Sequence, residues 1–376
     1  MSAIVRGLRP DYRPLAELAA QIRETILPDK FEKRPYLALE HIDAGDIVAR
    51  RQATPAGIRS AKFVFRRGDV LYGRLRPYLD KAVLAPFDGL ASTELLVLRP
   101  RLDVDPQFLA FAMHSRPILK QAIDTTAGVN HPRTSWESIR VLQVYCPPIE
   151  EQRRIARILL TIQQTKAATQ EVTSAAVLFK RKYLQRIFGG DFPAVPMREV
   201  ASVRTSFPSP ERLRPSDDGE MLYLKVSDLG RTHGPFVTTS ALTFSLDRKA
   251  LNVGATVFPK RGGAIGTNVK RIIGKPAVID PNLIAIEPGP RLDERYLFGF
   301  MEHTDLRTLQ DHTPIPQLNK HNVDSLLIPL PPIDEQRRVA RTLSALDAKL
   351  EAEHSNQVAI GHVFSSTLQS FFGSGA

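Results

Sequence analysis

The chain has 376 residues, with 51 lysines and arginines against 40 acidic residues and a formal net charge of +11. Hydrophobic residues make up 43% and charged residues 24%, which excludes an intrinsically disordered protein. One cysteine, Cys146, excludes a disulfide framework and a zinc site built from several cysteines. The first residues lack a signal-peptide core, and no run approaches the ~18 apolar residues of a membrane span. We therefore expect a soluble, cytoplasmic protein whose basic surplus favours polyanionic partners.

Residues 1–148 alternate short β-type runs with Gly, Pro and Asp turns, which predicts a first mixed α+β domain. Strands are expected at Lys62–Phe65, Asp69–Tyr72 and Leu95–Leu98, and a helix from Pro106 to Gln121. We interpret Trp136 and Cys146 as core residues.

Residues 149–191 predict one long helix. From Ile155 to Ile187, apolar or small residues recur every three or four positions, and Gly189 begins a typical helix stop. A helix over 151–187 would be about 55 Å long at 1.5 Å per residue. Its packing area does not stabilise it alone, so it needs a partner.

Residues 192–330 predict a second α+β domain, and residues 331–376 a second long helix. In the second domain, strands are expected at Met221–Leu224, Ala255–Phe258 and Leu283–Ile286, and a helix from Glu294 to Leu309. The second long helix has a polar gap at His354–Gln357, which predicts an interruption in its packing.

The two halves repeat each other. Residues 147–159 read PPIEEQRRIARIL and residues 331–343 read PPIDEQRRVARTL, with ten of thirteen positions identical at an offset of 184. This predicts a tandem duplication with a period too long for a solenoid. The second domain begins where the first helix ends and finishes where the second begins. If its ends lie close together, the two helices run antiparallel, with a domain at each end and an approximate two-fold axis.

Each domain carries a basic loop directly after a predicted strand. One such run is usually a solvated surface hairpin, but its recurrence at equivalent positions favours DNA binding. The candidate DNA-binding residues are Arg50, Arg51, Lys62, Arg74, Arg76, Tyr78 and Lys81 in the first domain and Lys260, Arg261, Asn268, Lys270 and Arg271 in the second. The expected base readers are Arg74, Arg76, Arg261 and Asn268, and the expected phosphate contacts are Lys81, Lys260, Lys270 and Arg271.

A repeated Glu-Gln-Arg-Arg segment opens both long helices. It predicts either a surface for a partner protein or simple i,i+3 pairing within the helix, and the residues leave both open. The candidate partner-binding residues are Glu151, Gln152, Arg153, Glu335, Gln336 and Arg337.

No catalytic or metal-binding motif is recognisable in the sequence. The nine histidines are scattered and form no HExxH pattern. The glycine-rich run 262–266 lacks the Lys-Ser/Thr of a phosphate-binding loop. The segment 280–283, Asp-Pro-Asn-Leu, lacks the second proline and the aromatic residue of a nucleotide-methyltransferase motif, and predicts a turn entering a strand. We therefore expect no catalytic residues, no metal site and no cofactor in this chain.

The chain has two divergent domains, each followed by a helix that begins with the motif PPI-[ED]-E-Q-R-R, at Pro147–Arg154 and Pro331–Arg338. This arrangement resembles the specificity (S) subunit of type I restriction–modification enzymes. The resemblance covers essentially the whole chain. It implies target recognition domains at 1–148 and 192–330, a central spacer helix at 149–191 and a C-terminal spacer helix at 331–376. It also implies that each recognition domain reads one half of a bipartite, asymmetric site in double-stranded DNA.

The resemblance further implies a non-catalytic subunit that scaffolds other proteins. Its implied partners are two methyltransferase (M) subunits and two restriction (R) subunits. S-adenosylmethionine, ATP and magnesium would then belong to those partners.

Two other functions stay open from the residues. One is a stand-alone, sequence-specific DNA-binding protein of the same architecture, which tight binding to a specific site without any M subunit would favour. The other is a nuclease or methyltransferase fused to recognition domains, which the missing motifs disfavour.

Overall fold

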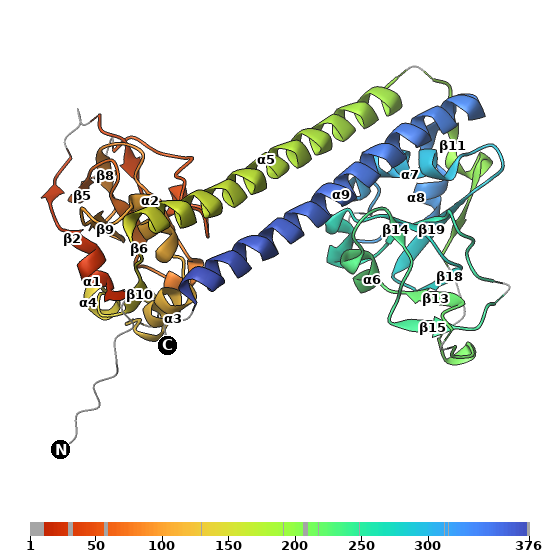
Figure 1. Ribbon diagram of the computed structural model, residues 1–376. Coiled ribbons are helices and arrows are strands. Elements are labelled where there is room, and N and C mark those ends of the chain that lie inside the picture. Colours follow the sequence, from red (N-terminus) through yellow and green to blue (C-terminus); the bar gives the residue numbers. More distant parts are fainter. Residues whose placement is uncertain are drawn as a thin grey trace. The chain divides into compact units, whose positions relative to one another are not determined.

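The computed structural model describes residues 11–28, 33–55, 59–128, 130–190, 192–205, 210–216, 218–247, 249–311, 313–314 and 316–373. The chain divides into two compact units (Figure 1). The first unit holds residues 1–168 and 357–376, and the second holds residues 169–356. Each unit therefore combines one mixed domain with segments of both long helices.

The first unit is built from short strands and short helices. Its strands are β1 (Tyr12–Pro14), β2 (Ala19–Ile22), β3 (Thr25–Ile26), β4 (Tyr36–Leu37), β5 (Lys62–Phe65), β6 (Val70–Gly73), β7 (Ala82–Leu84), β8 (Gly89–Ala91), β9 (Leu95–Pro100) and β10 (Gln143–Tyr145). Its short helices are α1 (Leu15–Leu18), α2 (Pro106–Ala112), α3 (Arg116–Asp124) and α4 (Trp136–Ile139).

The second unit has a comparable set of elements. Its strands are β11 (Ala194–Pro196), β12 (Ala201–Arg204), β13 (Met221–Leu224), β14 (Phe236–Val237), β15 (Leu242–Phe244), β16 (Thr256–Pro259), β17 (Arg271–Ile273), β18 (Ala277–Ile279), β19 (Leu283–Pro288) and β20 (Leu327–Pro329). Its short helices are α6 (Val226–Arg231), α7 (Glu294–His303) and α8 (Lys320–Asp324). The two long helices are α5 (Ile149–Phe188) and α9 (Ile333–Phe372).

The sheets of the two units follow the same order. The main sheet runs β2-β9-β6-β7 in the first unit and β12-β19-β16-β17 in the second, where β14 adds a fifth strand. The register also matches, since Ala19 lies opposite Pro100 and Ala201 lies opposite Pro288. The predicted fold class is confirmed: the protein is α+β, with a repeated mixed domain followed each time by a long helix.

Two predicted helices are shorter than expected. The helix predicted from Pro106 to Gln121 is two helices, because Ser115 has an extended backbone (φ −67°, ψ 146°) and Pro117 follows in the first turn of α3. The helix predicted from Glu294 ends at His303, where the backbone of Thr304 becomes extended.

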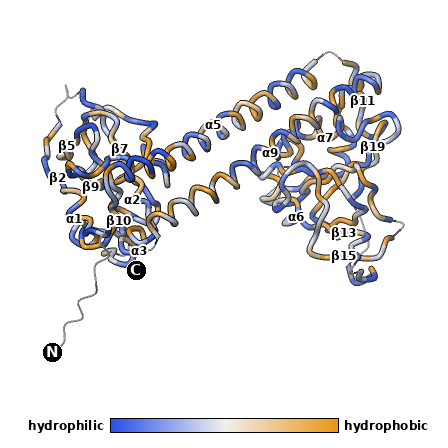
Figure 2. Tube along the Cα trace, viewed as in Figure 1, coloured by the Kyte–Doolittle hydropathy of each residue, from blue (hydrophilic) through white to orange (hydrophobic). Residues whose placement is uncertain are grey.

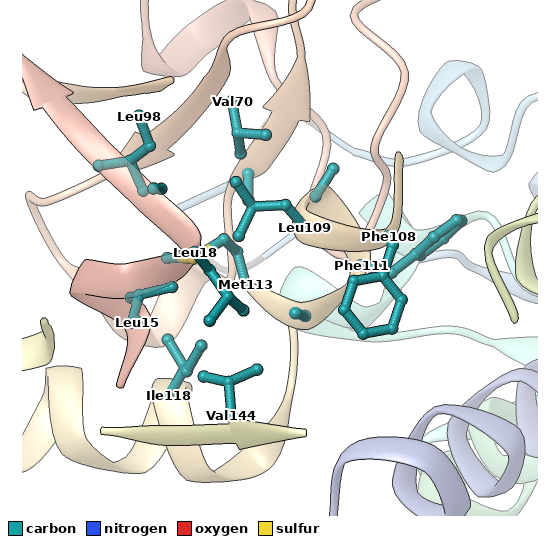
Figure 3. Packing of buried hydrophobic residues seen from close by; sticks show 14 of the residues in the cluster. Leu15, Leu18, Val70, Leu98, Phe108, Leu109, Phe111, Met113, Ile118 and Val144 are labelled. Atoms are coloured by element: carbon teal, nitrogen blue, oxygen red, sulfur yellow. The ribbon is translucent and has the colours of Figure 1, made fainter. Parts of the chain in front are cut away.

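The core of the first unit forms between the main sheet and helices α2 and α3. Figure 3 shows Leu15, Leu18, Met113 and Ile118 within this cluster. Trp136 and Cys146 belong to it as well, which confirms both as core residues.

The end of α9 completes that core. The ring of Phe372 lies 5.1 Å from that of Phe108, and the ring of Phe364 lies 6.2 Å from that of Phe111, centroid to centroid. At the polar gap 354–357, where an interruption in packing was predicted, residues 354–356 are exposed, while α9 itself is continuous.

In the second unit, α5 and α9 both pack against the mixed domain. Leu184 of α5 and Leu343 of α9 belong to its core, and both approach Gly299 of α7. A Cβ at Gly299 would lie 2.5 Å from Leu343, so the glycine allows α7 to approach the long helices closely. Lys180 contacts Asp347 further along, so the two helices are antiparallel here.

Figure 2 shows hydrophobic and hydrophilic residues interspersed along both long helices, as expected for helices that bury one face. Among the described residues, no helix is long and apolar enough to cross a membrane.

Candidate nucleic-acid interface

A basic loop follows the equivalent strand of each main sheet. In the first unit, residues 74–81 follow β6 and include a short 3-10 helix at Pro77–Leu79. In the second, residues 260–270 follow β16 and include a 3-10 helix at Gly262–Thr267. The two basic loops, whose recurrence the sequence predicts, thus lie at the same position in both main sheets.

Three backbone hydrogen bonds fix the first loop where it leaves the sheet. The amide of Arg74 donates to the carbonyl of Glu94 at 2.9 Å. The carbonyl of Arg74 accepts from the amide of Thr134 at 3.0 Å, and the amide of Arg76 donates to the carbonyl of Pro132 at 2.8 Å.

The second loop is held at the matching points. The amide of Lys260 donates to the carbonyl of Asn282 at 2.9 Å. The carbonyl of Lys260 accepts from the amide of Leu318, and the amide of Gly262 donates to the carbonyl of Pro316, both at 2.8 Å. The repeat therefore preserves the anchoring of the loop while its side chains differ.

One turn position is left-handed in both loops. The backbone φ is +50° at Arg76 and +68° at Gly262. Glycine adopts this conformation freely, whereas a residue with a Cβ incurs about 1 kcal/mol or more of strain. The first loop thus keeps this turn although an arginine occupies it.

The first loop presents several of its predicted residues to solvent. Arg76 is exposed, and Tyr78 is 55% exposed. Arg74 is half-buried, and its Nε is buried without a hydrogen-bond partner. The ammonium of Lys81 donates to the carbonyl of Leu39 at 2.7 Å, so its charge is bonded within the fold.

The other basic candidates of the first unit lie outside this loop. Arg50 and Arg51 are exposed and pair with Asp46 and Asp43. Lys62 is only 6% exposed, and its ammonium donates to Ser60 Oγ at 2.5 Å. Burial lowers the pKa of Lys62. The ammonium of Lys62 is therefore bonded to the residues just before it in the chain and does not lie on a surface open to DNA.

In the second loop, Arg261 is the exposed arginine, and Lys260 is half-buried. A Cβ built at Gly263 or Gly266 would meet nothing within 4 Å, so the backbone at these positions is open to a close approach by a ligand.

Asn268 and Lys270 lie beneath this loop. Asn268 Oδ1 accepts from the amide of Leu306 at 2.9 Å and from Lys270 Nζ at 2.8 Å. Lys270 is 4% exposed, and burial lowers its pKa to about 8. Both side chains are thus hydrogen-bonded within the fold. The expected phosphate contact of Lys270 is corrected, because its ammonium is buried and bonded to Asn268. Base reading by Asn268 stays a prediction.

Arg271 also supports the loop from within the fold. Its guanidinium donates to the carbonyls of Lys270 and Thr232, both at 2.7 Å. Burial lowers its pKa, although the nearby Glu302 opposes this effect. Both terminal nitrogens of Arg271 thus donate within the fold, and its phosphate contact stays a prediction.

The structure adds two residues that the sequence prediction missed. Arg133 forms a β-bridge with Leu75, and Gln317 forms the matching bridge with Arg261. The prolines that precede them, Pro132 and Pro316, are separated by the repeat offset of 184, which was the available sequence signal.

Arg133 is held by a carboxylate. Its Nε and Nη2 donate to Glu94 at 2.9 and 2.7 Å, and its Nη1 donates to the carbonyl of His131 at 3.1 Å. The hydrogen bonds from Arg133 lower the pKa of Glu94, with smaller contributions from Arg74 and His131.

The glutamine of the first Glu-Gln-Arg-Arg segment connects its helix to the domain before it. Gln152 is 1% exposed, and its Nε2 donates to the carbonyls of Pro147 at 2.8 Å and Asp103 at 3.1 Å. Its Oε1 accepts from the amide of Asp105 at 2.9 Å.

Gln336 makes the same contacts in the second unit. Its Nε2 donates to the carbonyls of Pro331 and Arg291, and its Oε1 accepts from the amide of Asp293 at 2.9 Å. The prediction that Gln152 and Gln336 bind a partner is therefore corrected. Both side chains are buried and hydrogen-bonded within the fold.

The charged members of these segments stay on the surface. They form the expected i,i+3 ion pairs Arg153–Glu150 (2.7 Å), Arg154–Glu151 (2.6 Å), Arg338–Glu335 (2.5 Å) and Arg337–Asp334 (3.7 Å). Binding of a partner by Glu151, Arg153, Glu335 and Arg337 stays a prediction.

Among the described residues, no group of three or more His, Cys, Asp or Glu side chains is placed to hold a metal ion. The segment 280–283 is a turn entering β19, as predicted, with the amide of Asn282 donating to Asp280 Oδ1.

The chain is similar in sequence to known proteins. A family model described as the type I restriction modification DNA specificity domain matches residues 59–178 and 199–359. The type I restriction enzyme EcoDI specificity subunit of Escherichia coli is 26% identical over 148 residues, which are 39% of this chain and 32% of that protein. The putative type I restriction enzyme MjaX specificity subunit of Methanocaldococcus jannaschii is 19% identical over 338 residues, 79% of this chain and 76% of that protein. The match thus spans about a third of the length of the E. coli relative.

Two solved structures have a similar fold. The S subunit of a type I restriction-modification system from M. genitalium aligns with a TM-score of 0.62 and 13% identity, over 99% of this chain and 98% of that one. A chain from a study of complex assembly and conformational transition in the type I R-M system aligns with a TM-score of 0.59 and 21% identity, over 97% and 98%.

Proposed function

Because this chain belongs to the family of type I restriction-modification DNA specificity domains, we propose that it is the specificity subunit of a type I restriction–modification enzyme. In this role it reads a bipartite, asymmetric site in double-stranded DNA, one half with each unit. It carries out no chemistry itself.

The observation that carries the proposal is the pair of loops at 74–81 and 260–270. Both are anchored by the same backbone hydrogen bonds, yet they expose different side chains, Arg76 and Tyr78 in one and Arg261 in the other. Equal anchoring supports a common mode of approach to DNA, and different side chains support two different half-sites. Arginine donates a fork of hydrogen bonds to guanine or phosphate.

The proposed partners are two M subunits and two R subunits. S-adenosylmethionine, ATP and magnesium would be bound by those partners. The exposed ion pairs that open α5 and α9 are a candidate contact surface for them.

Mapping methylated adenines in DNA from cells that contain the complex tests the proposal. We expect a single bipartite motif with two unlike halves. Specific binding by the purified chain alone, without any adenine methylation, would instead favour a stand-alone DNA-binding protein.

Arg261→Ala tests the assignment of the second loop. We expect this variant to lose or relax recognition of one half-site only, at a cost of about 1–3 kcal/mol per lost base contact. Arg198→Ala, an exposed arginine outside the loop, is the matched control. An unchanged methylation motif in Arg261→Ala would contradict the loop assignment.

A further inference from the structure

Arg133 stands beside the exposed part of the first basic loop. Its backbone forms a β-bridge with Leu75, and the carbonyl of the preceding Pro132 accepts from the amide of Arg76. Its side chain is 39% exposed. The guanidinium therefore lies next to the loop that is proposed to meet DNA, and solvent reaches it.

Glu94 fixes the direction of this guanidinium. The carboxylate accepts from Nε and Nη2, a two-point contact that a single hydrogen bond would not provide. The carbonyl of His131 accepts from Nη1 at 3.1 Å. A guanidinium held on two sides loses little further freedom when it binds a third group.

The contacts leave part of the donor fork unused. A guanidinium has five N–H groups. The bonds to Glu94 and His131 use three of these N–H groups, one on each of Nε, Nη2 and Nη1. One N–H on Nη1 and one on Nη2 remain. Two neighbouring N–H donors match O6 and N7 of guanine in the major groove.

We infer that Arg133, oriented by Glu94, reads a guanine in the half-site recognised by the first unit. The inference rests on the proposed function, because it requires that this unit binds DNA. Arg133 is then a specificity-determining residue, and Glu94 is a positioning residue that acts through it.

The second unit carries a different side chain at the same position. Gln317 occupies the matching β-bridge with Arg261, and its Nε2 lies 3.3 Å from Asn319 Oδ1. Glutamine does not offer the guanine-reading fork of arginine. The assignment to guanine therefore applies to the first half-site only, and Gln317→Ala serves as a control that acts on the other half.

The first experiment uses the unaltered complex of the chain with its methyltransferase subunits. DNA duplexes that carry the mapped site are made with 7-deazaguanine at each guanine of the two half-sites in turn. This base lacks the N7 acceptor but still pairs with cytosine. In the half-site that Arg261→Ala leaves unaffected, we expect the replacement of at least one guanine to lower the affinity about 5- to 150-fold. If that half-site has no guanine that responds, the inference is wrong.

The second experiment compares substitutions within the complex. Arg133→Lys keeps the charge but removes the fork, so discrimination for guanine at that position should fall about tenfold or more. Glu94→Gln should relax discrimination at the same base pair while leaving the salt dependence of binding unchanged, since no phosphate contact is lost. A merely structural role for Glu94 would weaken binding to all sequences alike.

Arg140→Lys is the matched control, because Arg140 is an exposed arginine of the same unit that pairs with Glu137. It should leave the motif unchanged. If the unaltered complex methylates no bipartite site, the proposed function fails. If it does so, and Arg133→Lys reads the same motif with the same selectivity, the inference alone fails.

Discussion

Lys270 is a buried cation at the base of the second loop. Its ammonium is bonded to Asn268, and the nearby carboxylates of Glu302 and Asp305 favour its charged form, but burial outweighs them and lowers its pKa from 10.5 to about 8. The charged lysine therefore destabilises the folded chain relative to a lysine in water.

This gives a pH dependence with a definite sign. Between about pH 8 and 10.5 the unfolded chain keeps a proton that the folded chain has released, so the contribution of Lys270 to the free energy of unfolding rises with pH. Below pH 8 both states hold the proton and the contribution is constant. Lys270→Met should therefore be more stable than the parent chain below pH 8, by at most about 3 kcal/mol. Its advantage should shrink as the pH rises towards 10.5.

Urea denaturation of both chains at pH 7 and pH 10 measures this difference. The comparison cancels the other groups that titrate in the same range. An equal stability difference at the two pH values would contradict the prediction.

At this scale, the sequence predicted the loops well and the direction of individual side chains less well. Arg76, Tyr78 and Arg261 are exposed as expected, whereas Lys62 and Lys270 are buried. The sequence alone does not show whether the charge of a basic residue faces solvent or is hydrogen-bonded to the neighbouring chain. Only the fold decides between these. The acceptors of Lys62 and Lys270, Ser60 and Asn268, lie only two residues away, but the burial of both lysines depends on the tertiary structure.

The long helices of the second unit are joined to its domain by a buried ionic network. Lys180 of α5 donates to Asp347 of α9 at 2.6 Å and to Glu302 of α7 at 2.7 Å, and Arg295 of α7 also pairs with Asp347. All three elements thus meet at Asp347.

Asp347→Ala should be strongly destabilising. It leaves the buried cations of Lys180 and Arg295 without their shared partner, at a cost of about 3–5 kcal/mol. Arg341→Ala, an exposed site on the same helix, should change the stability by no more than about 0.5 kcal/mol. Chemical denaturation of the three chains gives both values, and a loss for Asp347→Ala as small as that of the control would contradict the prediction.

The helices also show what periodicity can predict. The predicted helix 151–187 is observed as Ile149–Phe188, because apolar spacing and the glycine stop at Gly189 are local signals. The ionic network was not predictable in this way. At the repeat offset of 184, Asp347 corresponds to Gln163, which instead donates to the carbonyl of Gly45 at 2.8 Å. At this position the two halves thus share the helix but use different polar contacts.

For the whole molecule, the duplication predicted two similar domains, and the structure has them. The division between the compact units was not predicted, since it falls within both long helices. The last turns of α9 belong to the first unit, where Phe364 and Phe372 contact α2. Such contacts between residues more than 250 positions apart leave no local pattern in the sequence.

A chain that ends at residue 362 tests this arrangement. It lacks Phe364 and Phe372, and the loss of a buried phenylalanine costs about 3–5 kcal/mol. We expect faster amide hydrogen exchange in α2 and α3, with α7 unchanged, because the core of the second unit contains no residue from that end of α9. Equal protection of α2 in both chains would contradict this.

The position of Phe364, Leu368, Phe371 and Phe372 has a consequence for how the protein is made. The ribosome synthesises Phe108 and Phe111 before the second unit, but these four side chains only after it. Until then Phe108 and Phe111 lack their aromatic partners, and the apolar surface of α2 stays open to incorrect contacts. The first domain is therefore synthesised before the second but completed only after it, once the last turns of α9 have been made.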